Sequence, residues 1–361
     1  MPNYVNVMVV GFLLSSMLAQ AETLKYYGSF AFYNRGSYVE IVENQGINHY
    51  GDLVIPDSIE GLPVTRIGDA AFKDQTIETV VIPDSVRFIG DDAFYRCEEL
   101  TSVYLSKNLS EIGDRAFYDC EGLMQLSLPA SLRIMGSAAF RYCSNLSSIP
   151  LPDGLHSMGD YVFANTAITS LEVPMSIDRI PAFAYSGTSL SEIAIPSHVV
   201  EIGEHAFSSC QQVRSLDLGT NVSRIGEYAF SGCHSLSAVV IPDNVKHLGS
   251  GSFNNCERLA GVIMEGPVPD YVGSSIFSRH NGLPNLYYHS AHSGFLAYAN
   301  MPWQTYNSTP IQDWRIVDNF ICVVLEEEVY LVAYTGTDSV LTIPETILDL
   351  PVTKIGTYAF F

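Results

Sequence analysis

Residues 100–120 read LTSVYLSKNLSEIGDRAFYDC, and variants of this stretch recur through most of the chain. The Ile-Gly-x-x-Ala-Phe part returns with a regular spacing of 23 residues between phenylalanines. One copy reads as irregular, because Ile180-Pro181-Ala182-Phe183 lacks two residues between its isoleucine and its phenylalanine. A unit this short cannot bury its own apolar side chains. The copies are therefore predicted to stack into a solenoid with an interior row of rings: Phe72, Phe94, Phe117, Phe140, Phe163, Phe207, Phe230 and Phe253.

Each unit predicts a strand followed by a turn. The strand part alternates apolar and polar residues at its end, as at Val103 and Leu105, which is typical of a strand with one buried face. Proline commonly follows and ends the strand, because it has no N–H for the next ladder bond. The motif glycine turns the chain. The segment after it suits a short helical turn, in which Asp91, Asp92 and Asp114 would cap free N–H groups.

This order of strand, proline-containing turn, Ile-Gly-x-x-Ala-Phe and cysteine closely resembles the BspA-type leucine-rich repeat family of bacterial and protist surface proteins. The resemblance covers residues from about 53 to 277. We therefore predict an α/β, mostly β, leucine-rich repeat solenoid of about nine 23-residue repeats. Parallel strands would form one face, and short helical turns or extended segments the other. The resemblance, and not the period, implies an extracellular protein with a binding or adhesive role.

Composition excludes several classes of protein. Apolar residue types make up 47% of the 361 residues and charged types only 16%, which excludes a disordered chain. Only Met1–Ala21 approaches the apolar length of a membrane span, so a polytopic membrane protein is excluded as well. The net charge of −21 would repel phosphate backbones, and we expect no nucleic-acid partner.

The N-terminus is interpreted as an export signal. Val5 to Ala19 is an apolar core, and Ala19-Gln20-Ala21 is the small-x-small pattern that precedes a cleavage site. The segment before the core departs from the pattern, because it has no Lys or Arg. A buried N-terminal strand and an uncleaved anchor are the alternatives. The signal peptide at 1–21 predicts a secreted or cell-surface protein with no membrane span in the mature chain.

The chain also repeats at a distance of 288 residues. Residues 53–72 and 341–360 are identical at 12 of 20 positions. A hairpin-like segment precedes each of them, starting at Phe30 and at Phe320, and we interpret both as the N-terminal caps that solenoids need. The predicted division is a signal peptide, a hairpin cap, a repeat array, a C-terminal cap with linker, and the start of a second cap and array: 1–21, 22–52, 53–265, 266–311 and 312–361.

We expect the second array to be truncated. Its single entry copy stops at Phe361 and would leave Ile343, Val352, Ile355 and Phe360 without a stacking neighbour. The alternative is that residues 312–361 fold back as an extra cap on the first array and so hide these side chains.

The cysteines are predicted to be buried thiols. Six of them hold the same repeat position, and Thr166 and Ser186 take that position in the other copies. Disulfides or a metal cluster are the competing interpretation in an exported protein. The chain has no Cys-x-x-Cys pair, and parallel stacked side chains do not supply the disulfide torsion. The six residues are Cys97, Cys120, Cys143, Cys210, Cys233 and Cys256, and Cys322 lies outside this row.

Other candidates for chemistry are weak. His289 and His292 have a spacing that a metal could share on a helix, but no acidic ligand is near and a solvated loop is the simpler interpretation. No phosphate loop, nucleophile elbow or calcium loop is present. We therefore expect no catalytic, cofactor-binding or metal residues, and no enzyme. Four asparagines stand in glycosylation sequons: Asn108, Asn145, Asn221 and Asn307.

The outward residues of the main strands form the candidate partner-binding face. A protein or glycan partner outside the cell is the first hypothesis, a structural envelope component without a specific ligand the second, and an enzyme the third. A plain solvated sheet face is the competing interpretation, because the row is mostly small and polar. The candidate residues are Thr79, Val81, Ser102, Tyr104, Gln125, Ser127, Ser170, Glu172, Glu192, Ser215 and Asp217.

Overall fold

A computed structural model describes most of the chain from residue 23 onward. The signal peptide predicted at 1–21 lies outside the described residues, as do His292 and Asn307. The described residues are 23–45, 51–278, 284–289, 291, 308–336, 338, 340–356 and 359–360.

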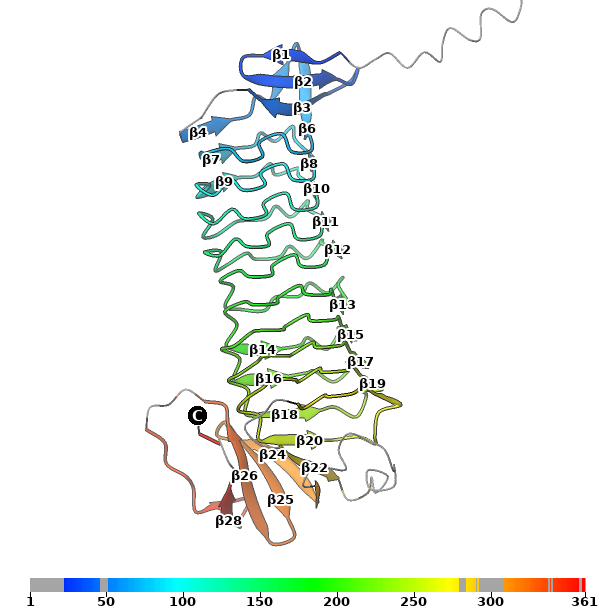
Figure 1. Cartoon of the computed structure of the whole chain (residues 1–361), viewed down its shortest axis with the longest axis vertical. Coiled ribbons are helices and arrows are strands. Elements are labelled where there is room, and N and C mark those ends of the chain that lie inside the picture. Colours follow the sequence, from blue (N-terminus) through cyan, green and yellow to red (C-terminus); the bar gives the residue numbers. More distant parts are fainter. Residues whose placement is uncertain are drawn as a thin grey trace, which may run out of the picture.

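The molecule is a rod of stacked turns, with an antiparallel hairpin at one end and a second one near the other (Figure 1). The main strands pair in parallel in three groups. These strands are β4 (Gly51–Val54), β7 (Ile77–Val81) and β9 (Ser102–Tyr104), then β14 (Glu192–Ala194) and β16 (Ser215–Asp217), then β18 (Ala238–Ile241), β20 (Gly261–Met264), β22 (Asn285–His289) and β23 (Ser308–Ile311).

A second parallel ladder runs through the isoleucine of each Ile-Gly motif. Within the described residues, ten successive turns carry a strand of this ladder, against the roughly nine repeats expected, and the predicted leucine-rich repeat solenoid is confirmed. The strands are β6 (Leu62–Ile67), β8 (Phe88–Ile89), β10 (Glu111–Ile112), β11 (Ile134–Met135), β12 (Ser157–Met158), β13 (Arg179–Ile180), β15 (Glu201–Ile202), β17 (Arg224–Ile225), β19 (His247–Leu248) and β21 (Tyr271–Val272).

The segment after each glycine forms consecutive turns, and the described residues contain no helix. Two non-glycine residues four apart adopt a left-handed conformation in such a turn, as at Asp92 (φ 55°) and Arg96 (φ 56°). Every second N–H then points along the rod and donates to the next turn: the Phe94 N–H meets the Ala116 carbonyl at 2.7 Å. These bonds satisfy backbone groups that a helical turn would have satisfied internally. They form a third row of contacts between turns.

The motif aspartates bond between turns as well, instead of capping a helix. The Asp91 carboxylate accepts the N–H of Asp114 at 2.8 Å, and the Asp114 carboxylate accepts the N–H of Ser137 at 2.6 Å. Such charge-assisted bonds to a backbone N–H are among the stronger hydrogen bonds in proteins. The acidic residue of the motif therefore ties each turn to its successor.

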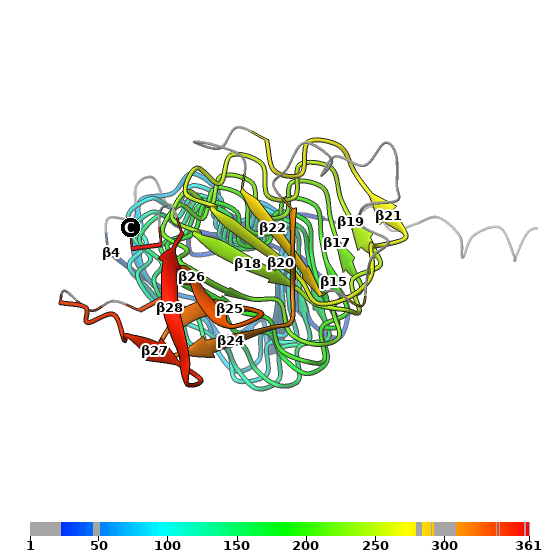
Figure 2. The same cartoon turned by 90° about the horizontal axis from the view of Figure 1, so that it is seen from below.

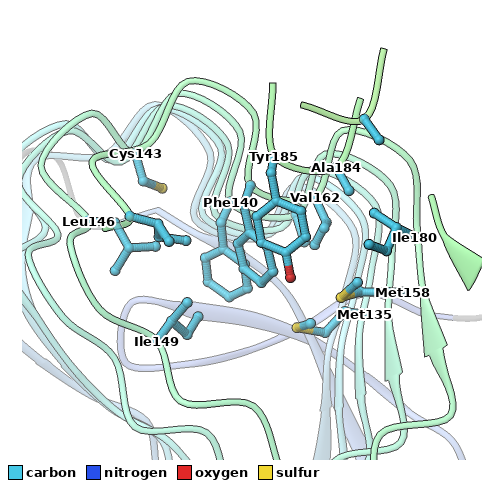
Figure 3. Close-up of a cluster of buried hydrophobic side chains, with 14 of the residues drawn as sticks. Met135, Phe140, Cys143, Leu146, Ile149, Met158, Val162, Ile180, Ala184 and Tyr185 are labelled. Atoms are coloured by element: carbon cyan, nitrogen blue, oxygen red, sulfur yellow. The ribbon is translucent and has the colours of Figure 1, made fainter. Parts of the chain in front are cut away.

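One continuous core runs along the rod and is built around the predicted ring stack. The rings of Phe117 and Phe140 lie 5.4 Å apart at an interplanar angle of 2°, which confirms the stacking expected for the regular copies. In Figure 3 the rings stand between a Cys143 and Leu146 side and a Met135 and Met158 side. Burial of these rings and their aliphatic neighbours supplies the main stabilisation of each turn.

The copy that reads as irregular in sequence is complete in the structure. Tyr185 holds the core ring position and stacks on Phe207 at 5.5 Å, whereas Phe183 lies at the partly exposed left-handed position. The motif is therefore Ile180-Pro-Ala-Phe-Ala-Tyr185, and no residue is missing between isoleucine and ring. The cysteine position belongs to Thr188 and not to Ser186, because the Thr188 hydroxyl is buried and lies 3.3 Å from the Cys210 thiol.

The second ladder is interrupted between β12 and β13, because no pairing joins these strands. Elsewhere the motif glycine donates its N–H to the preceding turn, as from Gly203 to the Ile180 carbonyl at 2.9 Å. Pro181 takes the glycine position here and has no N–H to donate to Met158. Pro181 therefore separates the two turns locally, while the bond from Tyr161 to Ala182 at 2.9 Å still joins them.

Two hairpins of the same design flank the array. The first pairs β1 (Lys25–Tyr27), β2 (Phe30–Asn34) and β3 (Val39–Asn44), and β3 continues in parallel into β6, which β5 (Ser58–Ile59) also pairs. The second repeats this order 288 residues later, and its first strand, β24 (Asp313–Val317), is the counterpart of β1. Its remaining strands are β25 (Phe320–Leu325), β26 (Glu328–Tyr334), β27 (Thr346–Ile347) and β28 (Leu350–Ile355).

Candidate binding surface on the strand face

The structure brings most of the predicted face residues into register across the parallel strands. Thr79 pairs with Ser102 and Val81 with Tyr104 between β7 and β9. Farther along the rod, Glu192 pairs with Ser215 between β14 and β16. The alternate residues of these strands, such as Val80 and Ile193, are buried in the core. Strand alternation therefore fixes the predicted side chains on the outside.

The open face carries one strongly exposed aromatic residue among small polar ones. Tyr104 exposes 62% of its surface, and Gln125, Ser127 and Glu192 are also exposed. Aromatic side chains dominate the energetics of protein interfaces, because they bury a large area at a small entropy cost. Tyr104 is therefore the residue of this face best suited to anchor a partner.

The predicted face is interrupted in its middle. Between Leu105 and Ser191 the main strands are reduced to a single bridge from Gln125 to Ser148. Pro150 stands at an outward strand position there and cannot donate a ladder bond. Ser170 and Glu172 lie within this interruption, where the Glu172 carboxylate accepts the Leu151 N–H at 3.2 Å. The candidate residues thus form two strand patches joined by irregular backbone.

The C-terminal module, residues 312–356, covers the end of this same face. The outward side chains of Ala238, Ile263 and Tyr287 form a buried cluster with Val323 and Val332 from β25 and β26. Seen from the end of the rod, β25 and β26 lie next to β18 and β20 (Figure 2). The face is therefore open only up to β16.

At Gly261 the module packs tightly against the array. A Cβ atom at Gly261 would lie 2.1 Å from a methyl group of Val332, a distance that would force this side chain to move. One feature of the sequence indicates this contact but was not recognised in the sequence analysis. The outward positions change from polar at Asp217 to apolar or absent side chains at Ala238, Gly261 and Ile263.

A cleft opens at the edge of this contact. The Trp314 indole N–H donates to the Glu265 carboxylate at 3.0 Å, across the boundary between module and array. Burial raises the pKa of Glu265 above its ordinary value. The Trp314 bond opposes this shift, and the carboxylates of Asp243 and Asp217 reinforce it. Negative charge is therefore concentrated at this place.

The turn face holds a second feature that sequence analysis missed, a column of stacked surface rings. Tyr161, Phe183, His205 and Tyr228 follow each other at centroid distances of 4.2, 4.4 and 4.9 Å. Each is the first left-handed residue of its turn. The rings cover each other's faces and leave mainly their edges to solvent, so the column stabilises the stack and does not offer a platform for a ligand ring.

The cysteine row has the structural role predicted for it, since all seven cysteines are buried thiols. The Cys120 thiol donates to the Phe94 carbonyl of the preceding turn at 3.2 Å, and Cys143 donates to Phe117 in the same way at 3.0 Å. Burial raises the pKa of Cys97 and of Cys143 to about 12. These thiols therefore stay protonated and unreactive at neutral pH.

The sequon asparagines that the structure describes also join turns. The side-chain amides of Asn108, Asn145 and Asn221 each donate to a backbone carbonyl 24 residues upstream, at 2.8, 2.8 and 2.6 Å. A row of side-chain-to-backbone bonds of this kind satisfies carbonyls at the turn edge. The asparagine of the sequon is therefore explained by the stacking of the turns.

The described residues contain neither a candidate metal site nor a helix that could cross a membrane. No group of three or more His, Cys, Asp or Glu side chains in that part of the chain could hold a metal ion. His289, one half of the histidine pair, is exposed, and its Nδ1 accepts the N–H of Ala291 at 3.2 Å. No helix in the described part of the chain has the length and apolar character needed to cross a membrane.

These features define a leucine-rich repeat solenoid: stacked turns, a row of core rings and a parallel strand face. A family model described as "BspA type Leucine rich repeat region (6 copies)" matches residues 65–188 and 178–300. The chain therefore belongs to the BspA-type leucine-rich repeat family, as the sequence motifs indicated.

One solved structure supports the same fold, and others show further similarities. A leucine-rich repeat protein from Bacteroides ovatus is 24% identical, with 74% of this chain and 69% of that one covered at a TM-score of 0.66. A leucine-rich cell surface protein from Faecalibacterium prausnitzii is 22% identical, with 76% and 97% covered and a TM-score of 0.40. The pneumococcal vaccine antigen PcpA is 17% identical, with 81% and 99% covered and a TM-score of 0.44. No curated protein matches the chain significantly.

Proposed function

We propose that this protein is a secreted or cell-surface binding module that holds an extracellular protein or glycan on its open strand face. The observation that carries the proposal is the contrast along one strand face. The outward residues from Thr79 to Asp217 are exposed or half-buried, whereas Ala238, Ile263 and Tyr287 are buried under the C-terminal module. Solenoids present such faces as extended binding surfaces, supported by a rigid core. The proposal gives the protein no catalytic role.

The residues proposed to contact the partner are those predicted from the sequence. Tyr104 would anchor the first strand patch, and Glu192, Ser215 and Asp217 would contribute charge and hydrogen bonds in the second. The proposed division of the chain follows the same logic: a signal peptide at 1–21, a cap, the array that carries this face, and a C-terminal module that limits it.

The test is a binding screen of the full mature chain against panels of extracellular matrix proteins, host cell-surface proteins and glycans. Any partner found is then measured against the double variant Gln125→Arg/Ser127→Arg, which adds bulk and charge to the exposed face without touching the core. Met175→Arg is the matched control, because Met175 is 77% exposed in a loop off the strand face. We expect at least tenfold weaker binding for the double variant and unchanged binding for the control.

Two outcomes would oppose the proposal. A partner that binds the double variant and the parent chain with equal affinity does not use this face. Absence of any partner, together with retention of the protein in isolated cell envelopes, supports the alternative of a structural envelope component.

A further inference from the structure

A cleft of about 320 Å³ lies where the C-terminal module meets the open strand face. One wall comes from β16 and the residues after it, including Asp217, which sequence analysis had placed on the candidate face. The other wall comes from Trp314, Ile316 and Ile321 of the module. The cleft therefore exists only because the module is docked, and it ends the open part of the face.

Carboxylates and apolar side chains make up most of the lining of the cleft. The carboxylates are Asp217, Asp243 and Glu265, and none of the residues that line the cleft in the described structure carries a positive charge. The basic residue next in sequence, Arg315, is engaged by the Asp313 carboxylate. The apolar wall consists of Leu216, Leu218, Val240, Trp314, Ile316 and Ile321.

The acidic side of the cleft is held in place by hydrogen bonds. Trp314 donates to Glu265 at 3.0 Å, and the Asp217 carboxylate accepts the N–H of Gly219 at 2.9 Å. Within the described residues, no three acidic side chains are close enough to share a metal ion. The carboxylates of Glu265 and Asp217 are thus held in place at the cleft.

We propose that this cleft binds the side chain of a lysine or arginine residue of a protein partner. Such a side chain combines an aliphatic stem, which fits the apolar wall, with a cationic head, which fits three carboxylates and an indole ring. The inference rests on the proposed function and deepens it, because it selects a protein over a neutral glycan as the partner. The cleft would hold the anchor side chain while the rest of the partner extends along the face toward Tyr104.

The experiment uses the full mature chain with Trp303→Phe, which leaves Trp314 as its only tryptophan. The probes are Nα-acetyl-argininamide and Nα-acetyl-lysinamide, and the isosteric neutral control is Nα-acetyl-citrullinamide. Titrations followed by Trp314 fluorescence should show saturable binding of the two cations, at least tenfold tighter than citrullinamide. Added salt should weaken the binding of the two cations.

The variant Asp217→Asn/Glu265→Gln keeps the shape and the hydrogen-bonding atoms of the cleft and removes two charges. We expect it to bind the cationic probes at least tenfold more weakly. Asp153→Asn removes an exposed charge on another turn and should leave binding unchanged. Fluorescence of Trp314 in the absence of probe reports whether the module remains docked in each variant.

Equal binding of citrullinamide and argininamide would overturn the proposal, as would unchanged affinity in Asp217→Asn/Glu265→Gln. This failure is distinguishable from failure of the proposed function. If a partner binds Gln125→Arg/Ser127→Arg much more weakly than the parent chain and binds Asp217→Asn/Glu265→Gln with unchanged affinity, that result supports the strand face as the binding surface and rejects the cleft as its anchor. If the cationic probes bind but no partner for the strand face is found, only the proposal for the cleft is supported.

Discussion

The strand face of this protein has two regions that follow each other along the rod and differ in their outward side chains. From Thr79 to Asp217 most of these side chains are small or polar and are exposed or half-buried, and Tyr104 is aromatic and strongly exposed. From Ala238 to Tyr287 they are apolar and covered by β25 and β26. The buried positions are of the same kind in both regions, a row of rings and thiols. The buried residues therefore determine how the turns stack. The outward residues determine whether a turn is open to a partner or covered by the C-terminal module.

The largest expected effect concerns what the two regions share. Phe117→Ala under the open region and Phe253→Ala under the covered one should each destabilise the array by about 3–5 kcal/mol, because each leaves a cavity in the core. Since each turn contacts mainly its neighbours, the loss of hydrogen-exchange protection should stay near the altered turn. Unchanged protection around residues 94–140 in Phe117→Ala would contradict the core assignment.

A second prediction separates the regions by uncovering one of them. Val332→Asp places a charge in the buried cluster around Ile263 and Tyr287, at an expected cost of about 3 kcal/mol to docking of the module. The array itself should keep its stability, because its core does not include Val332. Hydrogen exchange would then show loss of protection in β25 and β26 only. Loss of protection throughout the array would show that docking and array folding are one event.

Alkaline pH should affect both regions alike, because the thiol row runs under both. The pKa of Cys97 and Cys143 is raised to about 12 in the folded protein, above the ordinary value near 9. Between these values the unfolded chain releases protons that the folded chain keeps, so stability is complete below about pH 9 and falls as the pH rises. The expected loss is roughly 1.4 kcal/mol per pH unit for each such thiol.

Denaturant titrations at pH 8 and pH 10 would measure this loss, with Cys97→Ser/Cys143→Ser as the comparison. The double variant should be less stable at pH 8 and should lose less stability between the two pH values. An equal loss in the parent and the double variant would show that the thiols do not cause the alkaline sensitivity.

The smallest expected effect lies at the interruption between β12 and β13. Pro181→Gly restores the N–H that other turns donate to their predecessor, a gain of about 1 kcal/mol. The greater freedom of glycine in the unfolded chain offsets this gain by a similar amount. We expect a net change in stability within about 1 kcal/mol, together with slow hydrogen exchange of the new amide at position 181. Fast exchange of that amide would show that another feature holds the turns apart.

The sequence was sufficient to predict the parts of the fold that follow from periodic burial. The spacing of Phe94, Phe117 and Phe140 predicts the stacked rings, and the common position of the cysteines predicts thiols in the interior. Residue type misassigned one copy, because the phenylalanine Phe183 resembles the other core rings more than the tyrosine Tyr185 does. Both the spacing and the depth of burial favour Tyr185, which lies five residues after Ile180, as Phe207 does after Ile202.

Other features depended on contacts that no local pattern contains. Left-handed residues such as Asp92 and Arg96 are not glycines, so the turns between ladders looked like helical turns in sequence. The cleft combines Asp217 with Trp314, residues almost a hundred positions apart, and forms only when the module docks. The change to apolar outward residues at Ala238 was the one sequence sign of that docking.

The strand face has an open region and a covered region, and one outward tyrosine in each region tests this contrast directly. Tyr104 is 62% exposed, whereas Tyr287 is 4% exposed. Hydroxyl-radical footprinting of the full mature chain, read by mass spectrometry, should oxidise Tyr104 rapidly and Tyr287 slowly, and Val332→Asp should make Tyr287 as reactive as Tyr104. Equal oxidation of both tyrosines in the parent chain would contradict the account, because it would mean that the C-terminal module does not cover the face.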